Sequence, residues 1–159
     1  MYLMCDCKSP LEFYNHYHQN FWNKIIHMIF IPFIVLSFRI FLSEVYIGQP
    51  WLNWPGLTEK MKFWVGRLLS NIYVIYYFTY GWREGFLMLV YFTWIECAYY
   101  YINDNIPRKY LLASCMFIFS WTMQFIGHEI EGNKPALFDS LSQAFTAAPL
   151  FSIQAFLST

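Results

Sequence analysis

Four long apolar stretches dominate this chain and limit what it can fold into. They run from Ile25 to Ile47, from Phe63 to Trp82, from Phe86 to Ile102 and from Tyr110 to Ile126. Each is about 17 to 23 residues long, near the length that an α-helix needs to cross the hydrocarbon core of a bilayer. The sequence therefore predicts an all-α integral membrane bundle of about four transmembrane helices, forming a single membrane-embedded domain over residues 1–159.

The composition agrees with a membrane environment and excludes several classes of partner. Apolar residues make up 58% of the chain and charged residues only 13%, whereas about a quarter of the residues in soluble domains are charged. The formal net charge is zero and no basic run occurs, so we expect no nucleic-acid partner. The sequence contains no G-x-G-x-x-G motif for a dinucleotide.

The start of the sequence lacks the pattern of a cleaved signal peptide, so the first apolar stretch is expected to direct insertion into the membrane.

Helix-start and helix-break signals flank the apolar stretches. The segment from Ser9 to Glu12 has the pattern of a capping box, which predicts a short N-terminal helix. The polar pair Gln19 and Asn20 is expected to interrupt that helix, with Asn20 capping the next one. After Pro135, the mixed polarity predicts a C-terminal amphipathic or re-entrant helix that breaks near Pro149.

A polar stripe follows the last apolar stretch. In the run WTMQFIGHEIEGNKP, Gln124, His128 and Glu131 stand at positions i, i+4 and i+7. These three residues share one face of a helix. Burying an imidazole and a carboxylate without partners costs several kcal/mol, on the order of 2–7 kcal/mol for a polar group. The stripe therefore needs a partner, and a metal ion would suit both side chains.

The histidines of the chain lie only near the two ends of the apolar region. They are His16, His18, His27 and His128, and none lies between Met28 and Gly127. Four spans return a chain to the membrane face where it began, so His128 is expected on the same face as His27. Two clusters that are distant in the sequence are thereby predicted to form one site.

Spacing sets a condition on that site. His18 and His27 are nine residues apart, which places them on opposite sides of an unbroken helix. They can converge only if the helix breaks near Gln19 and Asn20. Three imidazoles with a nearby carboxylate would suit Fe(II), Zn or Mn. Spacing alone leaves open the alternative that each histidine is simply a polar residue at the membrane boundary.

Glu96 is a second polar residue that calls for an explanation, because it lies in the middle of the third apolar stretch. A carboxylate inside a membrane is a functional candidate by default. Pairing with Arg67 or Arg39, as a purely structural contact, is the alternative. The sequence does not decide between the two.

The two ends of the chain together resemble a known family. The segments that carry the resemblance are FYNHYHQNFWNKIIHMIFIPF near the start and QFIGHEIEGNKPALFDSL near the end. They are similar to the two signatures of a family of small endoplasmic-reticulum and bacterial membrane proteins typified by the yeast 2-hydroxy fatty acid dioxygenase. The resemblance implies an oxidoreductase that uses ferrous iron, Fe(2+), and O2 to shorten long-chain 2-hydroxy fatty acids by one carbon. In yeast this α-oxidation belongs to sphingolipid degradation, the breakdown of phytosphingosine.

The resemblance also implies roles for particular residues. Its motif histidines correspond to His18, His27 and His128, which become the candidate iron ligands, whereas the pattern does not require His16. Glu131 corresponds to the carboxylate after the motif histidine and is the candidate catalytic residue, as ligand, outer partner or base. Further candidates for supporting the ligands or binding substrate are Asn23, Gln124 and Lys134. The implied location is the endoplasmic reticulum in a eukaryotic cell, and a homo-oligomer is left open.

Two other classes of function are kept as alternatives. One retains the metal and changes the chemistry to that of a lipid hydroxylase or hydrolase containing zinc or iron. The other is a scaffold or transporter whose histidines are only interfacial. A transporter is disfavoured because the sequence shows no inverted repeat and only one mid-span acid, Glu96.

Overall fold

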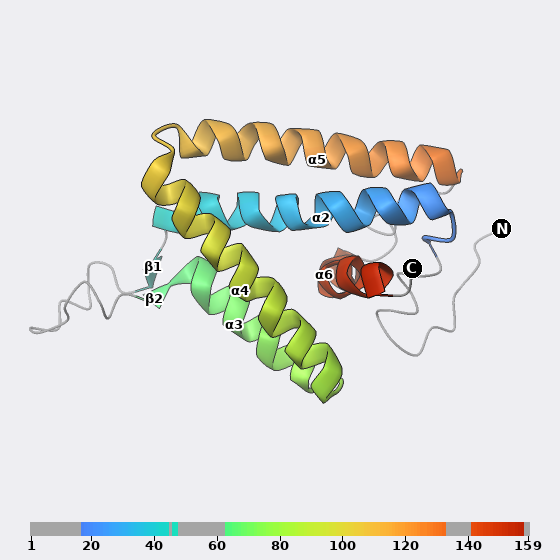
Figure 1. Cartoon of the computed structure of the whole chain (residues 1–159), viewed down its shortest axis with the longest axis horizontal. Coiled ribbons are helices and arrows are strands. Elements are labelled where there is room, and N and C mark those ends of the chain that lie inside the picture. The colour runs from blue at the N-terminus through green and yellow to red at the C-terminus, as the bar shows by residue number, and fades with distance from the viewer. Residues whose placement is uncertain (1–16, 45, 48–62, 133–140, 158–159) are drawn as a thin grey trace, which may run out of the picture. The chain divides into compact units, whose positions relative to one another are not determined.

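Helices make up nearly all of the fold. The structure, a computed structural model, describes residues 17–44, 46–47, 63–132 and 141–157. Within this part of the chain, the only strands are two short ones that pair antiparallel, Tyr46 opposite Trp64 and Ile47 opposite Phe63. The predicted all-α fold is confirmed (Figure 1). In chain order the elements are α2 (Phe21–Phe41), η1 (Leu42–Glu44), β1 (Tyr46–Ile47), β2 (Phe63–Trp64), α3 (Val65–Phe78), α4 (Trp82–Asn105), α5 (Lys109–Glu131) and α6 (Leu141–Leu157).

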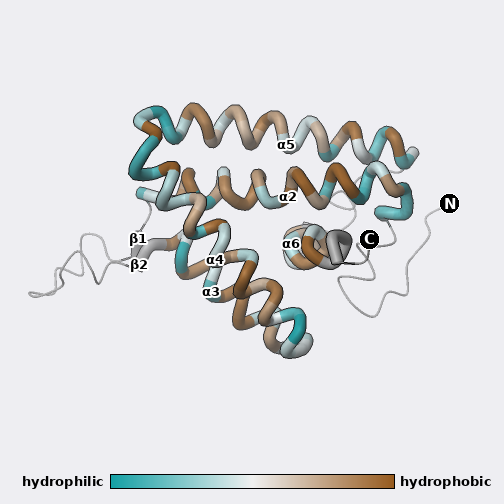
Figure 2. Tube along the Cα trace, in the orientation of Figure 1, coloured by the Kyte–Doolittle hydropathy of each residue, from teal (hydrophilic) through white to brown (hydrophobic). Residues whose placement is uncertain are grey.

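Three of the four expected spans are long and apolar enough to cross a membrane, namely Phe21–Glu44, Trp82–Asn105 and Lys109–Glu131. The stretch expected from Phe63 to Trp82 instead contains α3, which has 14 residues. At about 1.5 Å per residue, α3 is roughly 21 Å long, short of a core of about 30 Å. The first two residues of the expected stretch, Phe63 and Trp64, are extended, because they form β2, which pairs with β1. Figure 2 shows the hydrophobic colour along the helices and hydrophilic colour at the start of α2 and at the α4–α5 turn. The described elements form a helical membrane bundle.

Helix α2 begins where the sequence predicted a break. Residues 18–20 are not helical, and Asn20 caps the helix that starts at Phe21. The Asn20 Oδ1 atom accepts hydrogen bonds from the backbone N–H of Trp22 at 2.8 Å and of Asn23 at 3.4 Å. The expected helix from Ser9 lies outside the described residues.

This cap gives a first testable prediction. Asn20→Ala removes the side-chain acceptor and is expected to lower the free energy of unfolding by about 1 kcal/mol. Asn20→Ser is the matched control, since a hydroxyl can still accept from the same N–H groups. Denaturant unfolding of both variants in detergent, followed by tryptophan fluorescence, checks this. Equal stability of the two variants would contradict the capping role.

The chain separates into two compact units, Met1–Ile34 with Met116–Thr159, and Val35–Cys115. In the first unit, the start of α2 and the end of α5 run antiparallel (Figure 1). The Phe30 and Phe119 rings lie 5.5 Å apart. Near the helix ends, a Cβ atom added to Gly127 would lie 2.4 Å from Asn23 Oδ1. The glycine thus allows a polar side chain of α2 to lie directly against α5.

Helix α6 completes the first unit. The prediction of a break near Pro149 is wrong, because α6 continues from Leu141 to Leu157 with Pro149 inside it. The carbonyl oxygen of Pro149 accepts a hydrogen bond from Ser152 Oγ at 2.7 Å, so this polar group is satisfied within the helix. Leu150 and Phe151, directly after the proline, are buried. Their burial favours the continuous helix over a break.

An ion pair occupies the interior of the second unit. Arg39 of α2 meets Glu96 of α4 through two contacts, Nε to Oε1 at 2.6 Å and Nη2 to Oε2 at 3.0 Å. Arg39 is 4% exposed, and its guanidinium carbon lies 3.7 Å from the centre of the Tyr99 ring. Arg67, the other partner considered for Glu96, is exposed. Of the alternatives for Glu96, the structure shows the ion pair with Arg39.

Helix α3 packs closely against this ion pair. A Cβ atom added to Gly66 would lie 3.0 Å from Arg39 Cδ and 3.1 Å from its Nη1. Ser70, one turn later, directs its Oγ to the Gly66 carbonyl at 3.1 Å and lies 3.5 Å from Glu96 Oε1. One arginine therefore joins α2, α3 and α4.

Candidate metal centre

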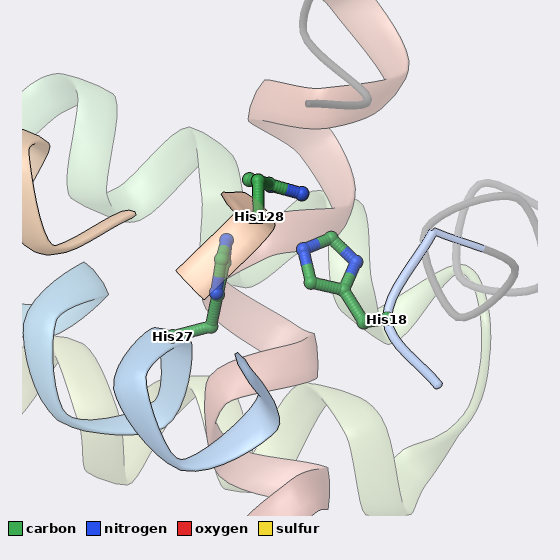
Figure 3. Close-up of side chains that lie close together, drawn as sticks. All are labelled: His18, His27 and His128. Atoms are coloured by element: carbon green, nitrogen blue, oxygen red, sulfur yellow. The ribbon is translucent and has the colours of Figure 1, made fainter. Parts of the chain in front are cut away.

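Three histidines from separate segments meet inside the first unit. His18 lies in the non-helical residues before α2, His27 lies on α2, and His128 lies in the last turns of α5. Their exposed fractions are 0%, 2% and 6%. Figure 3 shows the three rings gathered around a common space. The predicted convergence of the two ends of the chain is therefore observed.

The three rings lie close enough together to bind one metal ion between them. The ring centroids of His18 and His27 are 4.2 Å apart, and each is 4.9 Å from the centroid of His128. The rings meet edge to face, with interplanar angles of 63° to 85°. One nitrogen from each ring can be chosen so that all three lie within 4.8 Å of one another. This donor set could hold one metal ion, although its role as a ligand set remains a prediction.

The backbone of α2 orients one of these rings. The Nδ1 atom of His27 lies 3.0 Å from the carbonyl oxygen of Asn23, one helical turn earlier. When Nδ1 carries the proton and donates it there, the lone pair of the ring is on Nε2. Histidines that bind metals typically donate their other N–H to a backbone carbonyl or carboxylate in this way.

Glu131 lies at the end of α5 but outside the group of metal-binding atoms. Among the described residues, that group contains the three histidines only. The Glu131 carboxylate instead accepts three hydrogen bonds: from the backbone N–H of Gln19 at 2.5 Å, from that of Asn20 at 2.9 Å and from Asn23 Nδ2 at 2.5 Å. Its expected catalytic role stays a prediction.

The remaining candidate residues differ in what the structure says of them. Asn23 is fully buried between α2 and α5 and contacts Glu131. Gln124 lies one turn before His128 and is 5% exposed, and its Nε2 atom has no hydrogen-bond partner in the described part of the chain. Lys134 and His16 lie outside the described residues.

Comparison with known proteins shows the family of this chain. The family model described as "2-hydroxy-palmitic acid dioxygenase Mpo1-like" matches residues 4–159. The chain belongs to the Mpo1-like family. A similar relative is the 2-hydroxy-palmitic acid dioxygenase MPO1 of Saccharomyces cerevisiae, which is 32% identical over 155 residues, covering 97% of this chain and 81% of the yeast protein. No solved structure matches the chain.

In this Mpo1-like chain, two residues beside the histidines were missed by the sequence analysis. Phe151 of α6 is buried, and its ring centroid lies 5.0 Å from that of His18. No local pattern marked it, because it is one apolar residue in an apolar helix. Gly127 belongs to a segment that carries the family resemblance, but its importance follows only from the close approach of Asn23. Both residues gain their role from segments that are distant in the sequence.

Proposed function

We propose that this Mpo1-like chain is an Fe(II)-dependent dioxygenase that converts long-chain 2-hydroxy fatty acids into fatty acids one carbon shorter. In a eukaryotic cell it would act in the endoplasmic reticulum, in sphingolipid degradation. The observation that carries the proposal is the cluster of three buried histidines whose ligand atoms lie within 4.8 Å. Support comes from the yeast relative, whose name states dioxygenase activity on 2-hydroxy-palmitic acid.

The residues present suit iron. Imidazole is a ligand that Fe(II) accepts, and three protein ligands leave positions for substrate and oxygen. His18, His27 and His128 would hold the ion, with His27 oriented by the Asn23 carbonyl. Iron(II), when bound, would supply the one-electron chemistry that lets O2 react with an organic acid. The burial of the cluster would exclude bulk water from the reacting groups.

The substrate fits the same site chemically. A 2-hydroxy acid carries a carboxylate next to a hydroxyl, so two oxygens can approach one metal ion. Its acyl chain would lie among the apolar side chains of the helices, with the acid group at the histidines. The reaction balances without a further reductant: one 2-hydroxy acid and one O2 give the shortened acid, one CO2 and one H2O. The C1–C2 bond breaks, C2 and C1 are oxidised, and O2 is reduced.

Oxygen uptake tests the proposal. Detergent-purified protein, loaded anaerobically with Fe(II), is expected to consume one O2 for each 2-hydroxypalmitate and to release a C15 acid. Palmitate, which lacks the 2-hydroxyl group, is the matched control and is expected to give no uptake. Lipid turnover without oxygen would favour the hydrolase, and turnover only with an added reductant would favour the hydroxylase. Protein that neither binds iron nor consumes oxygen would favour the scaffold.

Gln124 gives a prediction about substrate binding. Its buried Nε2 is placed on the His128 face of α5, so it can donate to an oxygen of the acid group. Gln124→Leu is expected to lower kcat/KM by about 10- to 100-fold, the value of one hydrogen bond to a charged group. The change should appear mainly in KM, with bound iron unchanged. Steady-state oxygen uptake over a range of acid concentrations measures it, and an unchanged kcat/KM would contradict a hydrogen bond from Gln124 to the substrate.

A further inference from the structure

Hydrogen bonds connect the carboxylate of Glu131 to the segments that carry His18 and His27, and Glu131 lies three residues after His128 on α5. We propose that Glu131 is a positioning residue, which holds His18, His27 and His128 together through its hydrogen bonds rather than by binding the metal or taking a proton. This inference rests on the proposed metal site. It assigns one specific task to a residue for which ligand, outer partner and base were all open.

The first path leads to His18. This residue lies in a non-helical segment, so no helical hydrogen-bond ladder fixes it. The next two backbone N–H groups, those of Gln19 and Asn20, both donate to Glu131 Oε1. These bonds join positions that are 112 and 111 residues apart in the sequence. They attach the segment carrying His18 to the end of α5, where His128 lies one turn before Glu131.

The second path leads to His27. Asn23 donates from Nδ2 to Glu131 Oε2 at 2.5 Å, and its backbone carbonyl faces His27 Nδ1 at 3.0 Å. Asn23 is 0% exposed, and its Oδ1 sits where a Cβ on residue 127 would come within 2.4 Å. The absence of a side chain at Gly127 therefore lets Asn23 reach Glu131. Its fixed backbone then orients the His27 ring.

These contacts leave Glu131 little capacity for another role. A carboxylate has about four acceptor positions, and three are occupied by donors on both oxygens. A base needs an open oxygen aimed at the reacting proton. The atoms that could bind an ion come from the three histidines, among the residues that the structure describes. The geometry of Glu131 is that of a fixed anchor.

Three variants test the proposal through metal binding, without relying on turnover. Co(II) is titrated into metal-free wild-type protein and into Glu131→Ala, Glu131→Gln and Gly127→Ala, and its affinity is read from visible absorption. Glu131→Ala is expected to weaken Co(II) binding by about 10- to 100-fold, as loss of an outer partner does. Glu131→Gln is expected to stay within about threefold of wild type, because its amide oxygen still accepts from the two backbone N–H groups and the Asn23 amide can turn so that its oxygen accepts from the new NH2 group. Oxygen uptake should follow the affinities.

Gly127→Ala disturbs the contact between Asn23 and Glu131 without changing Glu131. It keeps the carboxylate but displaces Asn23, so it should weaken Co(II) binding about as much as Glu131→Ala. It also keeps the test open if Glu131→Ala does not fold. Ile130→Ala, an exposed position on the same helix, is the control for a general effect on α5 and should bind like wild type.

Other outcomes would overturn the proposal in recognisable ways. Normal Co(II) affinity in Glu131→Gln with kcat reduced by about 100-fold or more would identify a base. Equal loss of Co(II) affinity in Glu131→Gln and Glu131→Ala would identify a ligand. Normal affinity in Glu131→Ala would exclude an anchor. Wild-type protein that binds Co(II) but consumes no oxygen with iron would refute the proposed reaction, while the affinities still decide the role of Glu131.

Discussion

Alanine at any one of His18, His27 or His128 is expected to abolish oxygen uptake and to reduce Fe(II) affinity by more than about 100-fold. The reason is that in the proposed site each ring would supply one of three protein nitrogens, and losing a ligand should exceed the 10- to 100-fold effect of losing an outer partner. Iron per chain after desalting, together with Co(II) titration, measures the change. The three variants should behave alike, since their ligand atoms form one group.

His16→Ala is the matched control for these variants. It removes the same side chain two residues from His18, at a position that the family pattern does not require. Its iron content and oxygen uptake should equal those of wild type. Full iron occupancy in all three site variants would instead mean that the histidines are interfacial polar residues and that iron, if present, binds elsewhere.

The second large effect is expected at the ion pair of the other unit. Removing one partner of a buried pair typically costs about 3–5 kcal/mol, because the remaining charge is left buried. Glu96→Met should reach that range, since the arginine left behind cannot lose its proton. Arg39→Met should cost less, because the Glu96 side chain that is left behind is 18% exposed, whereas the Arg39 side chain is 4% exposed. The double variant should be more stable than Glu96→Met alone.

Denaturant unfolding in detergent of the wild type, both single variants and the double variant measures this coupling as a double-mutant cycle. Arg67→Met, which removes an exposed arginine from α3, should change stability by less than about 0.5 kcal/mol. Additive costs of the two single substitutions would contradict a stabilising contact. Loss of oxygen uptake with unchanged stability would give the pair a functional role instead.

The features of the site that follow from chain direction and local pattern could be predicted. The meeting of His27 and His128 was predicted from four spans, and the two rings do lie together, although only three helices of the described residues are long and apolar enough to cross a membrane. The Gln19–Asn20 pair indicated the break that lets His18 turn toward His27, and Asn20 caps α2 as expected. Local polarity and capping chemistry were sufficient for the break and the cap, because both depend on residues close in the sequence.

The features that depend on distant residues could not be predicted. Apolar content does not determine where α3 begins. The first two residues of the apolar stretch, Phe63 and Trp64, form β2 and pair with β1, so the helix starts only after them. Proline normally weakens a helix, yet Pro149 lies inside α6, followed by residues buried in the first unit. The three donors to Glu131 come from the opposite end of the chain. Only the folded arrangement shows that its carboxylate is already engaged.

The position of the histidines along the chain determines when iron could first be held. His18 and His27 leave the ribosome early, whereas His128 and Glu131 follow only after the whole of the second unit, Val35–Cys115, has been synthesised. A chain interrupted before α5 has only two of the three imidazoles and lacks the carboxylate that anchors the first. Metal binding and folding are coupled when ligands come from separate segments. If iron is held as proposed, loading would wait until the last helices have been made, because a half-made chain lacks the complete set of three imidazoles.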